Sequence, residues 1–508
     1  MSSMRKLRVV YSNPWVLGLF VAAIYLLFPT KVYYWDGIVF AQAIEDVGNT
    51  SAMPPISLAH PNHLIYNFAG YFFYRGLRAL GANVRAITAL QILNSVLGAG
   101  CVTILFLILR DTLRSTYFAV CLAFLFAFSA TWWKFSTDAN AYIPSVLFLL
   151  VSFYLVLPDR KARPLLVALS FFVAMCFHEL AVVAYPVFAL GVYLQGGAIA
   201  IRRRLRNAIV FSVAAFVLIV GAYAVVFYYA TGAFDVGRFL RWTASYSPDA
   251  DTHFNLWSNF GYSLRGQVRL FFGGRFNLLH GLINPAVLLL FVLFAAAVVG
   301  FVLAVALNLT TLKSRLRNLR LAPRQKTVLL LALVWAGVYL AFLFFWLPQN
   351  TFYRVIYLPA LILLLGLALS ALPTIGYRRT FATALFVSAV SLANFLFLIY
   401  PFSHVEKYPP LEFALQLRRD WSRGTSIFYG TQNSDAALVR YFNPGTHWYV
   451  LPDQPPATCD PYWLETTAID RLAGTSAGAR WLESHARPGT WRELNNGAYR
   501  LRFVQVNP

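Results

Sequence analysis

Tyr33-Tyr34-Trp35-Asp36-Gly37 follows closely on an apolar stretch that runs from about Pro14 to Thr30. An apolar run of this length is typical of a helix that crosses a membrane. The Asp36 carboxylate, set between an aromatic cluster and a glycine, is therefore expected at the membrane surface. Partial burial beside Trp35 would raise its pKa, and this makes Asp36 the first candidate for chemistry in the chain.

The composition places the whole chain in the same class. Of its 508 residues, 59% are hydrophobic and only 12% are charged. A soluble protein of this length could not bury so much apolar surface, whereas a polytopic helical membrane protein exposes it to lipid. The net charge of +22 is concentrated in short segments between apolar stretches, as the positive-inside rule expects. Because no basic stretch carries a groove-reading pattern, nucleic acid is not an expected partner.

Basic residues also predict the orientation of the chain. Arg5, Lys6 and Arg8 place the N-terminus in the cytoplasm, and every basic cluster from Arg110 onward then falls on the same side. The apolar stretch Leu64–Tyr74 spans about 16 Å as a helix, against a hydrocarbon core of about 30 Å. We therefore expect this stretch, and Ile38–Val47 before it, to form helices that lie along the outer surface.

This interpretation of the basic and apolar segments predicts about eleven spans in a multi-pass protein of the plasma (inner) membrane, with the C-terminus outside the cytoplasm. The expected spans, in order, are about Pro14–Thr30, Ala86–Leu109, Ser115–Trp133, Tyr142–Leu157, Pro164–Phe177, a sixth that ends before Arg202, Ala208–Ala230, an eighth that follows a long outer loop to about His280, a ninth that ends before Pro348, a tenth that starts near Tyr353, and Thr380–Tyr400.

The chain changes character after about Pro401. Helices are predicted at Glu412–Trp421 and Ser434–Tyr441, and strands at Ser426–Tyr429 and His447–Leu451. This alternation predicts a small α/β domain. The expected domains are thus a transmembrane domain, 1–400, and an extracytoplasmic domain, 401–508, with a structural or acceptor-guiding role.

Under this topology, the candidate site residues collect on the outer side of the membrane. They are Trp35 and Asp36 after the first span, His60 and His63 in the first outer loop, Asp138 after the third span, His178 and Glu179 beyond the fifth, and Arg354 before the tenth. Ionisable residues that interrupt an apolar hairpin, as the pair after the fifth span does, are usually functional.

Structural explanations compete for several of these residues. Asp138 also fits a helix N-cap, and His60 also fits an interfacial histidine. Arg354 could snorkel to lipid headgroups or hold an anionic ligand. Glu45 and Asp46, on the same loop as Asp36, are interpreted as solvated loop carboxylates.

The arrangement resembles the GT-C class of membrane glycosyltransferases, with a layout similar to the protein O-mannosyltransferases and the lipid A aminoarabinose transferase (glycosyltransferase family 39-like). In that class an acidic residue follows the first span, here Asp36, and a second follows the third span, here Asp138. A polar residue and a proline precede the second surface helix, here His60-Pro61. Pro348–Arg354 matches the polar break before an aromatic-rich span. Gly37 departs from the pattern, since relatives often have a second acid there, and His60 stands where they have Lys or Arg.

The resemblance implies a glycosyltransferase of the cell envelope that moves a sugar from a polyprenyl-phosphate donor to a protein or glycan acceptor at the outer face. Asp36 would act as general base, an effect of about 10²–10⁴-fold, with Asp138 as a second catalytic carboxylate. Arg354, His60 and His178 would stabilise the leaving phosphate. Trp35 could stack on a sugar face. The sequence leaves open whether a divalent cation assists, and which sugar is moved.

Two alternatives from other classes stay open. A lipid-linked glycan transporter or flippase would show charges within its spans and paired repeats. This sequence has few mid-span charges and no clear internal repeat, and its charged groups collect at one interface, which favours surface chemistry. A glycan polymerase would use similar chemistry at the outer face.

Overall fold

The computed structural model describes residues 13–50, 56–195, 200–244, 255–274, short helical pieces between 289 and 300, 321–370, 376–431, 433–453, 460–496 and 499–507. By their contacts, these residues form two compact units. The first comprises residues up to Thr30 and Ala43–Pro401, and the second comprises Lys31–Gln42 and Phe402–Pro508. Most of the eighth expected span lies outside the described residues.

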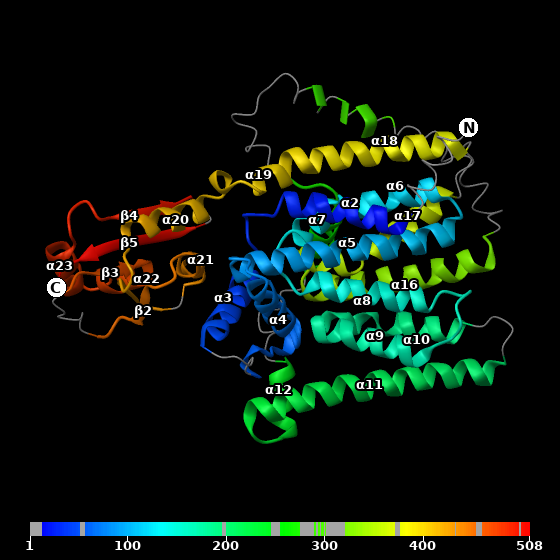
Figure 1. Cartoon of the computed structure of the whole chain (residues 1–508), viewed down its shortest axis with the longest axis horizontal. Helices are drawn as coiled ribbons and strands as arrows, with labels where there is room; N and C mark the ends of the chain where they lie inside the picture. The colour runs from blue at the N-terminus through cyan, green and yellow to red at the C-terminus, as the bar shows by residue number, and fades with distance from the viewer. Residues whose placement is uncertain are drawn as a thin grey trace. The chain divides into compact units, whose positions relative to one another are not determined.

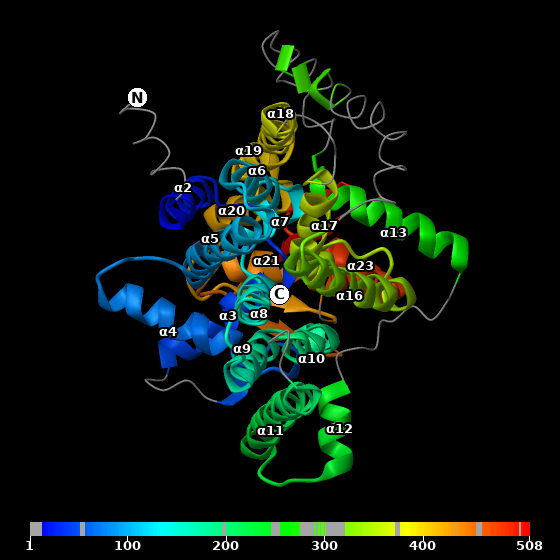
Figure 2. The same ribbon diagram turned by 90° about the vertical axis from the view of Figure 1, so that its right-hand side faces the viewer.

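The first unit is a bundle of apolar helices, most of which run side by side (Figure 1). The bundle helices are α2 (Pro14–Leu27), α5 (Ala86–Leu113), α6 (Thr116–Ala127), α7 (Ala130–Ser136), α8 (Tyr142–Leu155), α9 (Pro164–Phe177), α10 (Tyr185–Leu194), α11 (Ile201–Thr231), α16 (Pro323–Trp346), α17 (Leu358–Ser370) and α18 (Gly376–Asn394). Viewed along their axes, α9, α10 and α11 are neighbours at one edge of the bundle (Figure 2).

The bundle makes the chain a multi-pass membrane protein. Within the described ranges, four helices are long and apolar enough to cross a membrane by themselves: Ala86–Leu113, Ile201–Thr231, Pro323–Trp346 and Thr380–Phe402. Helices α6 and α7 together pass the same test but are bent by 69° at their junction. Several shorter apolar helices, α9 among them, coincide with further expected spans. Helix length alone does not test the predicted number of eleven spans. A helix shorter than the hydrocarbon core crosses the membrane only when the residues on either side of it cover the remaining thickness.

Helices occur where surface-lying helices are predicted. They are α3 (Trp35–Thr50) and α4 (Tyr66–Ala79), and α4 runs across the direction of the bundle helices (Figures 1 and 2). Helix α4 packs closely on α5, since a Cβ added at Gly70 would lie 2.5 Å from a methyl carbon of Leu90.

The expectation that Glu45 is a solvated loop residue is wrong. Its carboxylate lies 2.8 Å from Nε of Arg85. The same carboxylate accepts a hydrogen bond of 2.8 Å from the backbone N–H of Ala86. Glu45 is therefore part of the join between α3 and the start of α5, where a negative charge also favours the N-terminus of the helix.

The C-terminal residues of the second unit form the predicted α/β structure. A five-stranded sheet has the order β2-β1-β3-β5-β4, in which β1 is parallel to β2 and β3, and β5 is antiparallel to β3 and β4. Its strands are β1 (Ser426–Tyr429), β2 (His447–Val450), β3 (Tyr462–Glu465), β4 (Arg492–Asn495) and β5 (Arg500–Val506), and its helices are α20 (Pro409–Asp420), α21 (Ser434–Phe442), α22 (Thr466–Ala473) and α23 (Ser476–His485). An aromatic core that includes Trp421, Trp463 and Phe503 packs against this sheet.

The segment Lys31–Gln42, which carries Asp36, is grouped with this C-terminal sheet. The expected domain boundary after residue 400 stays a prediction.

Candidate functional site

Two short 3-10 turns bring histidines together in the first unit. They are η2 (Pro61–His63) and η3 (Glu179–Ala184), and they pack against each other. A histidine caps each turn: Nδ1 of His60 accepts from the backbone N–H of Asn62 at 3.3 Å, and Nδ1 of His178 accepts from that of Leu180 at 3.2 Å. A neutral imidazole that accepts at Nδ1 carries its proton on Nε2. Both capping histidines can therefore offer an N–H donor to a ligand.

Aromatic stacking holds these imidazoles in place. The rings of His60 and His63 are stacked with centroids 4.2 Å apart. His178 stacks on Tyr142 at 4.4 Å, and Tyr353 lies edge-on to His178 at 6.3 Å. Neither tyrosine is among the site residues predicted from the sequence. A signal was present, because Tyr142 closely follows Asp138 and Tyr353 directly precedes Arg354.

Burial keeps the first-loop histidines uncharged near neutral pH. It lowers the pKa of His60 from its usual 6.5 to about 4. Burial also lowers the pKa of His63 well below its usual value, and the neighbouring imidazoles of His60 and His178 lower it further. These rings therefore act as hydrogen-bonding groups rather than as cations at neutral pH.

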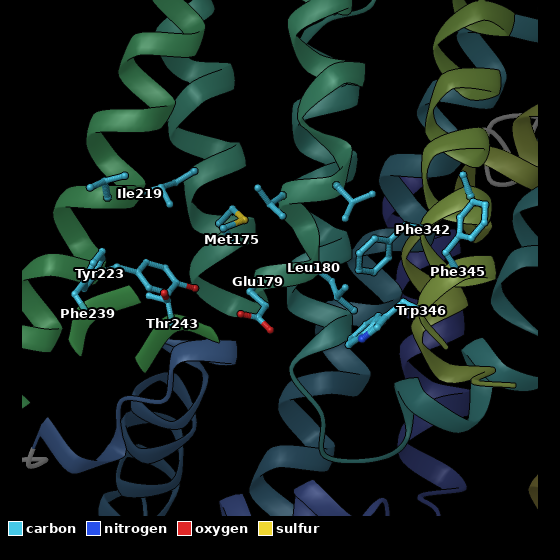
Figure 3. Close-up of a pocket in the computed structure, with 14 residues that line it drawn as sticks. Met175, Glu179, Leu180, Ile219, Tyr223, Phe239, Thr243, Phe342, Phe345 and Trp346 are labelled. Atoms are coloured by element: carbon cyan, nitrogen blue, oxygen red, sulfur yellow. The ribbon is translucent and has the colours of Figure 1, made fainter. Parts of the chain in front are cut away.

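Glu179 faces an apolar cavity beside the histidines. The cavity has a volume of about 800 Å³, and the Glu179 carboxylate points into it (Figure 3). The cavity is lined by Met175, Glu179, Leu180, Val182, Val183, Ile219, Val220, Tyr223, Phe239, Thr243, Ala341, Phe342, Phe345 and Trp346. These residues come from α9, η3, α11, α12 (Val236–Ala244) and α16. Such a shape suits an apolar chain that ends in a polar group.

The Glu179 carboxylate has no hydrogen bond or ion pair to any residue in the part of the chain that the structure describes. A half-buried charge among apolar side chains is costly unless donors approach it. By contrast, the hydroxyl of Tyr223, which also lines the cavity, donates to the carbonyl of Pro61 at 2.8 Å. This bond ties the cavity wall to η2 and its histidines.

Asp138 is fully buried and lies in a tightly bonded turn. Its carboxylate is ion-paired with Lys134 and accepts from the backbone N–H of Ala139 at 2.8 Å. The N-terminus of α8 is capped by another residue, since Oδ1 of Asn140 accepts from the N–H of Tyr142 at 3.2 Å. The N-cap interpretation of Asp138 is therefore wrong for α8, and its catalytic role stays a prediction.

Arg354 is completely buried, so it does not snorkel to headgroups. Its guanidinium donates to the carbonyls of Pro348 at 2.7 Å and Asn350 at 3.0 Å, and to the hydroxyl of Tyr357 at 3.0 Å. No carboxylate lies within ion-pair distance of it among the residues described. The charge is instead offset by these hydrogen bonds, which close the loop before α17.

Asp36 and Trp35 belong to the second unit. Asp36 lies in the first turn of α3, where the helix dipole favours a carboxylate. Burial raises the pKa of Asp36, and a hydrogen bond from the Tyr34 hydroxyl opposes part of that rise. The Trp35 side chain next to it is 42% exposed.

The eight predicted residues thus fall into three groups. His60, His63, His178 and Glu179 are brought together by η2 and η3. Asp138 and Arg354 each stabilise a turn in the same unit, and Asp36 and Trp35 lie in the second unit. Within the described ranges, no group of three or more His, Cys, Asp or Glu side chains could hold a metal ion.

Comparisons with known proteins add evidence at the level of the fold. No family model matches the sequence, and no curated protein sequence matches it. The crystal structure of ArnT from Cupriavidus metallidurans bound to undecaprenyl phosphate aligns with 97% of this chain and 97% of its own, with a TM-score of 0.60 and 12% identity. Its apo structure aligns with 99% of this chain and 98% of its own, at the same TM-score and identity.

This chain has a GT-C fold. Since the alignments cover nearly the whole length, the GT-C likeness includes both the helical bundle and the C-terminal sheet. The crystal structure of the Archaeoglobus fulgidus oligosaccharyltransferase in complex with Zn and sulfate aligns less well, with a TM-score of 0.48, 13% identity, 92% of this chain and 66% of that chain.

Proposed function

We propose that this protein is a glycosyltransferase that moves a sugar from a lipid-phosphate donor to an acceptor at the outer face of the membrane. The observation that carries the proposal is the apolar cavity that leads to the Glu179 carboxylate beside the histidines of η2 and η3. A lipid-linked sugar has the same two parts, an apolar chain and a polar head. The undecaprenyl phosphate bound to ArnT supports a polyprenyl phosphate as the carrier here.

Each part of the donor has a candidate partner. The isoprenoid chain lies against the apolar wall formed by α11 and α16. Neutral His60 and His178 donate from Nε2 to the phosphate, because their Nδ1 atoms are occupied by backbone N–H groups. Glu179 accepts from a hydroxyl of the sugar or acceptor, since its carboxylate would repel a phosphate. Arg354 acts by holding the loop from Pro348 to Tyr357, which includes Tyr353, and the ring of Tyr353 lies against His178.

The reaction needs a base and a stabilised leaving group. An acceptor hydroxyl attacks the anomeric carbon while the bond from that carbon to the phosphate oxygen breaks. The hydroxyl proton passes to Asp36, and the lipid phosphate leaves with the bonding electrons. The raised pKa of Asp36 favours this role, because a carboxylate with a higher pKa is a stronger base.

The test is sugar transfer by the purified protein in lipid nanodiscs, with a panel of radiolabelled polyprenyl-phosphate sugars. Asp36→Asn keeps the size and much of the hydrogen bonding but cannot accept the proton. We expect it to insert normally and to transfer sugar at least about a hundredfold more slowly, the lower end of the usual range for a general base. This corresponds to about 3 kcal/mol of barrier.

Asp46→Asn is the matched control. Asp46 is exposed on the same helix, whereas Glu45 is unsuitable because it is ion-paired with Arg85. The control should keep nearly the parent rate. Equal rates for Asp36→Asn and the parent would remove the proposed base and leave the transporter interpretation ahead.

A further inference from the structure

The segment that carries Asp36 is held by contacts with the C-terminal residues. The backbone N–H of Lys31 donates to the carbonyl of Phe402 at 2.5 Å. The ring of Tyr33 stacks on that of Phe442, with centroids 5.6 Å apart and planes at 29°. Asp36 follows three residues after Tyr33, in the first turn of α3. Whatever fixes Tyr33 therefore also limits where the Asp36 carboxylate can point.

The Phe442 side chain is itself held in place by the C-terminal fold. Phe442 is the last residue of α21 and packs against the aromatic core of the sheet. The residue after it is fixed as well, because Nδ2 of Asn443 donates to the carbonyls of Ala414 at 3.0 Å and Val439 at 2.8 Å. The position of the Phe442 ring is thus set by the fold of the C-terminal sheet and its helices.

The segment between α2 and α3, which leads into the first turn of α3 and Asp36, has no regular structure. No helix or strand is assigned to residues 28–34, and α3 begins only at Trp35. A chain in this state samples many backbone angles unless tertiary contacts restrain it. A general base, however, must lie within hydrogen-bond reach of the proton that it removes.

We propose that the C-terminal α/β residues position Asp36, with Phe442 as the positioning residue that acts through Tyr33. This inference rests on the proposed function, in which Asp36 is the base. It gives the C-terminal sheet a part in the transfer reaction itself. Phe442 touches neither substrate nor reacting atoms, and its effect is on the geometry of the carboxylate.

The test uses the full-length protein in nanodiscs and compares three variants. Phe442→Ala removes the ring that stacks on Tyr33, and Phe442→Tyr keeps an aromatic ring there. Phe428→Ala is the matched control, because Phe428 on β1 packs against the other core cluster of the sheet and its ring contacts are to Tyr449 and Tyr462. Phe428→Ala also removes a phenylalanine ring from the C-terminal fold, but it leaves the stack of Tyr33 on Phe442 in place.

We expect Phe442→Ala to lower kcat by about tenfold to a hundredfold, since small misplacements of catalytic groups cost this much. The KM for the lipid donor should change by less than about twofold, because positioning of a base acts on the chemical step. Phe442→Tyr should restore nearly the parent rate, and Phe428→Ala should keep it. Amide hydrogen exchange of residues 31–42 should become faster in Phe442→Ala alone.

Two results would overturn the inference. One is unchanged exchange of residues 31–42 in Phe442→Ala. The other is an equal loss of kcat in Phe442→Ala and Phe428→Ala, which would indicate general destabilisation of the sheet. The exchange measurement does not depend on sugar transfer. A failure of the proposed function, seen as an active Asp36→Asn variant, is therefore distinguishable from a failure of the positioning role.

Discussion

At the scale of single residues, four carboxylates near the predicted outer surface differ in their partners. Glu45 is paired with Arg85, and Asp138 with Lys134. Asp36 and Glu179 have no ion pair within the described part of the chain. A carboxylate that is partly buried without a cation is costly to keep, and such groups are concentrated at functional sites. The contrast favours Asp36 and Glu179 over the other two as groups that meet a ligand.

Burial of His60 predicts a dependence of stability on pH. Its pKa is about 4 in the folded protein and about 6.5 in the unfolded chain. Between these values the unfolded chain binds more protons, so stability is present above pH 6.5 and is lost as the pH falls towards 4. His60→Asn keeps a capping oxygen but cannot titrate. We expect its apparent Tm to fall less than that of the parent between pH 7 and pH 4.5.

A thermal scan in nanodiscs at several pH values measures this difference. The matched control is His447→Asn, since His447 is exposed on β2, and its curve should run parallel to that of the parent. If the Tm of His60→Asn falls as steeply with decreasing pH as the Tm of the parent, protonation of His60 does not destabilise the folded protein and the prediction is wrong.

Among the helices of the bundle, a bend in one expected span leads to the turn that holds Asp138. The expected third span, Ser115–Trp133, is two helices, α6 and α7, with a bend of 69°. The hydroxyl of Ser129, between the two helices, donates to the carbonyl of Phe126 at 2.9 Å and so helps to satisfy one of the last carbonyls of α6, which have no partner within the helix. The short helix after the bend leads directly to the turn of Asp138. Hydropathy alone does not reveal this break, because both helices are apolar.

The contact of α13 (Leu256–Phe271) with Arg354 predicts opposite effects for two glycines of one helix. A Cβ at Gly266 would lie 2.3 Å from Nε of Arg354, whereas a Cβ at Gly261 would meet nothing within 4 Å. Gly266→Ala should therefore displace the buried guanidinium from its carbonyl partners and lower the Tm. Gly261→Ala should raise the Tm or leave it unchanged, because alanine is about 1 kcal/mol better than glycine in a helix.

Thermal unfolding of the two variants in the same lipid decides the point. An equal Tm for both would mean that α13 does not lie over Arg354. The pair also probes transfer activity, which should fall only in Gly266→Ala, because the loop that Arg354 holds includes Tyr353, whose ring contacts Tyr142 and His178.

At the scale of the whole molecule, the distribution of basic residues predicts the topology. The N-terminus is expected in the cytoplasm and the C-terminus outside it. Alkaline phosphatase fused after Pro508 should be active. A cysteine placed at Asn83, between α4 and α5, should react with an impermeant thiol reagent added from outside. Protection of that cysteine would mean that α4 crosses the membrane, and an inactive fusion would contradict the predicted number of spans.

The class of the protein and many of its elements follow from local signals in the sequence. Helix α9 has the predicted bounds Pro164–Phe177, and strand β1 has the predicted bounds Ser426–Tyr429. These elements were predictable because their signals are local: a proline at the helix start, a run of apolar residues and a cluster of β-branched and aromatic residues. The strands β3, β4 and β5 were not predicted. Strand β3 is defined by its pairing with β1 and β5, which are distant in the chain, and β4 by its antiparallel pairing with β5.

Which polar residues meet depends on the tertiary fold. It brought His60 to His178, built the cavity at Glu179 from α9, η3, α11, α12 and α16, and packed Tyr33 on Phe442. It also buried Arg354, which the sequence left between two interpretations. The physical reason is that hydropathy and propensity depend on neighbours along the chain. Such contacts depend instead on the complementary shapes of packed elements, and no local pattern records them.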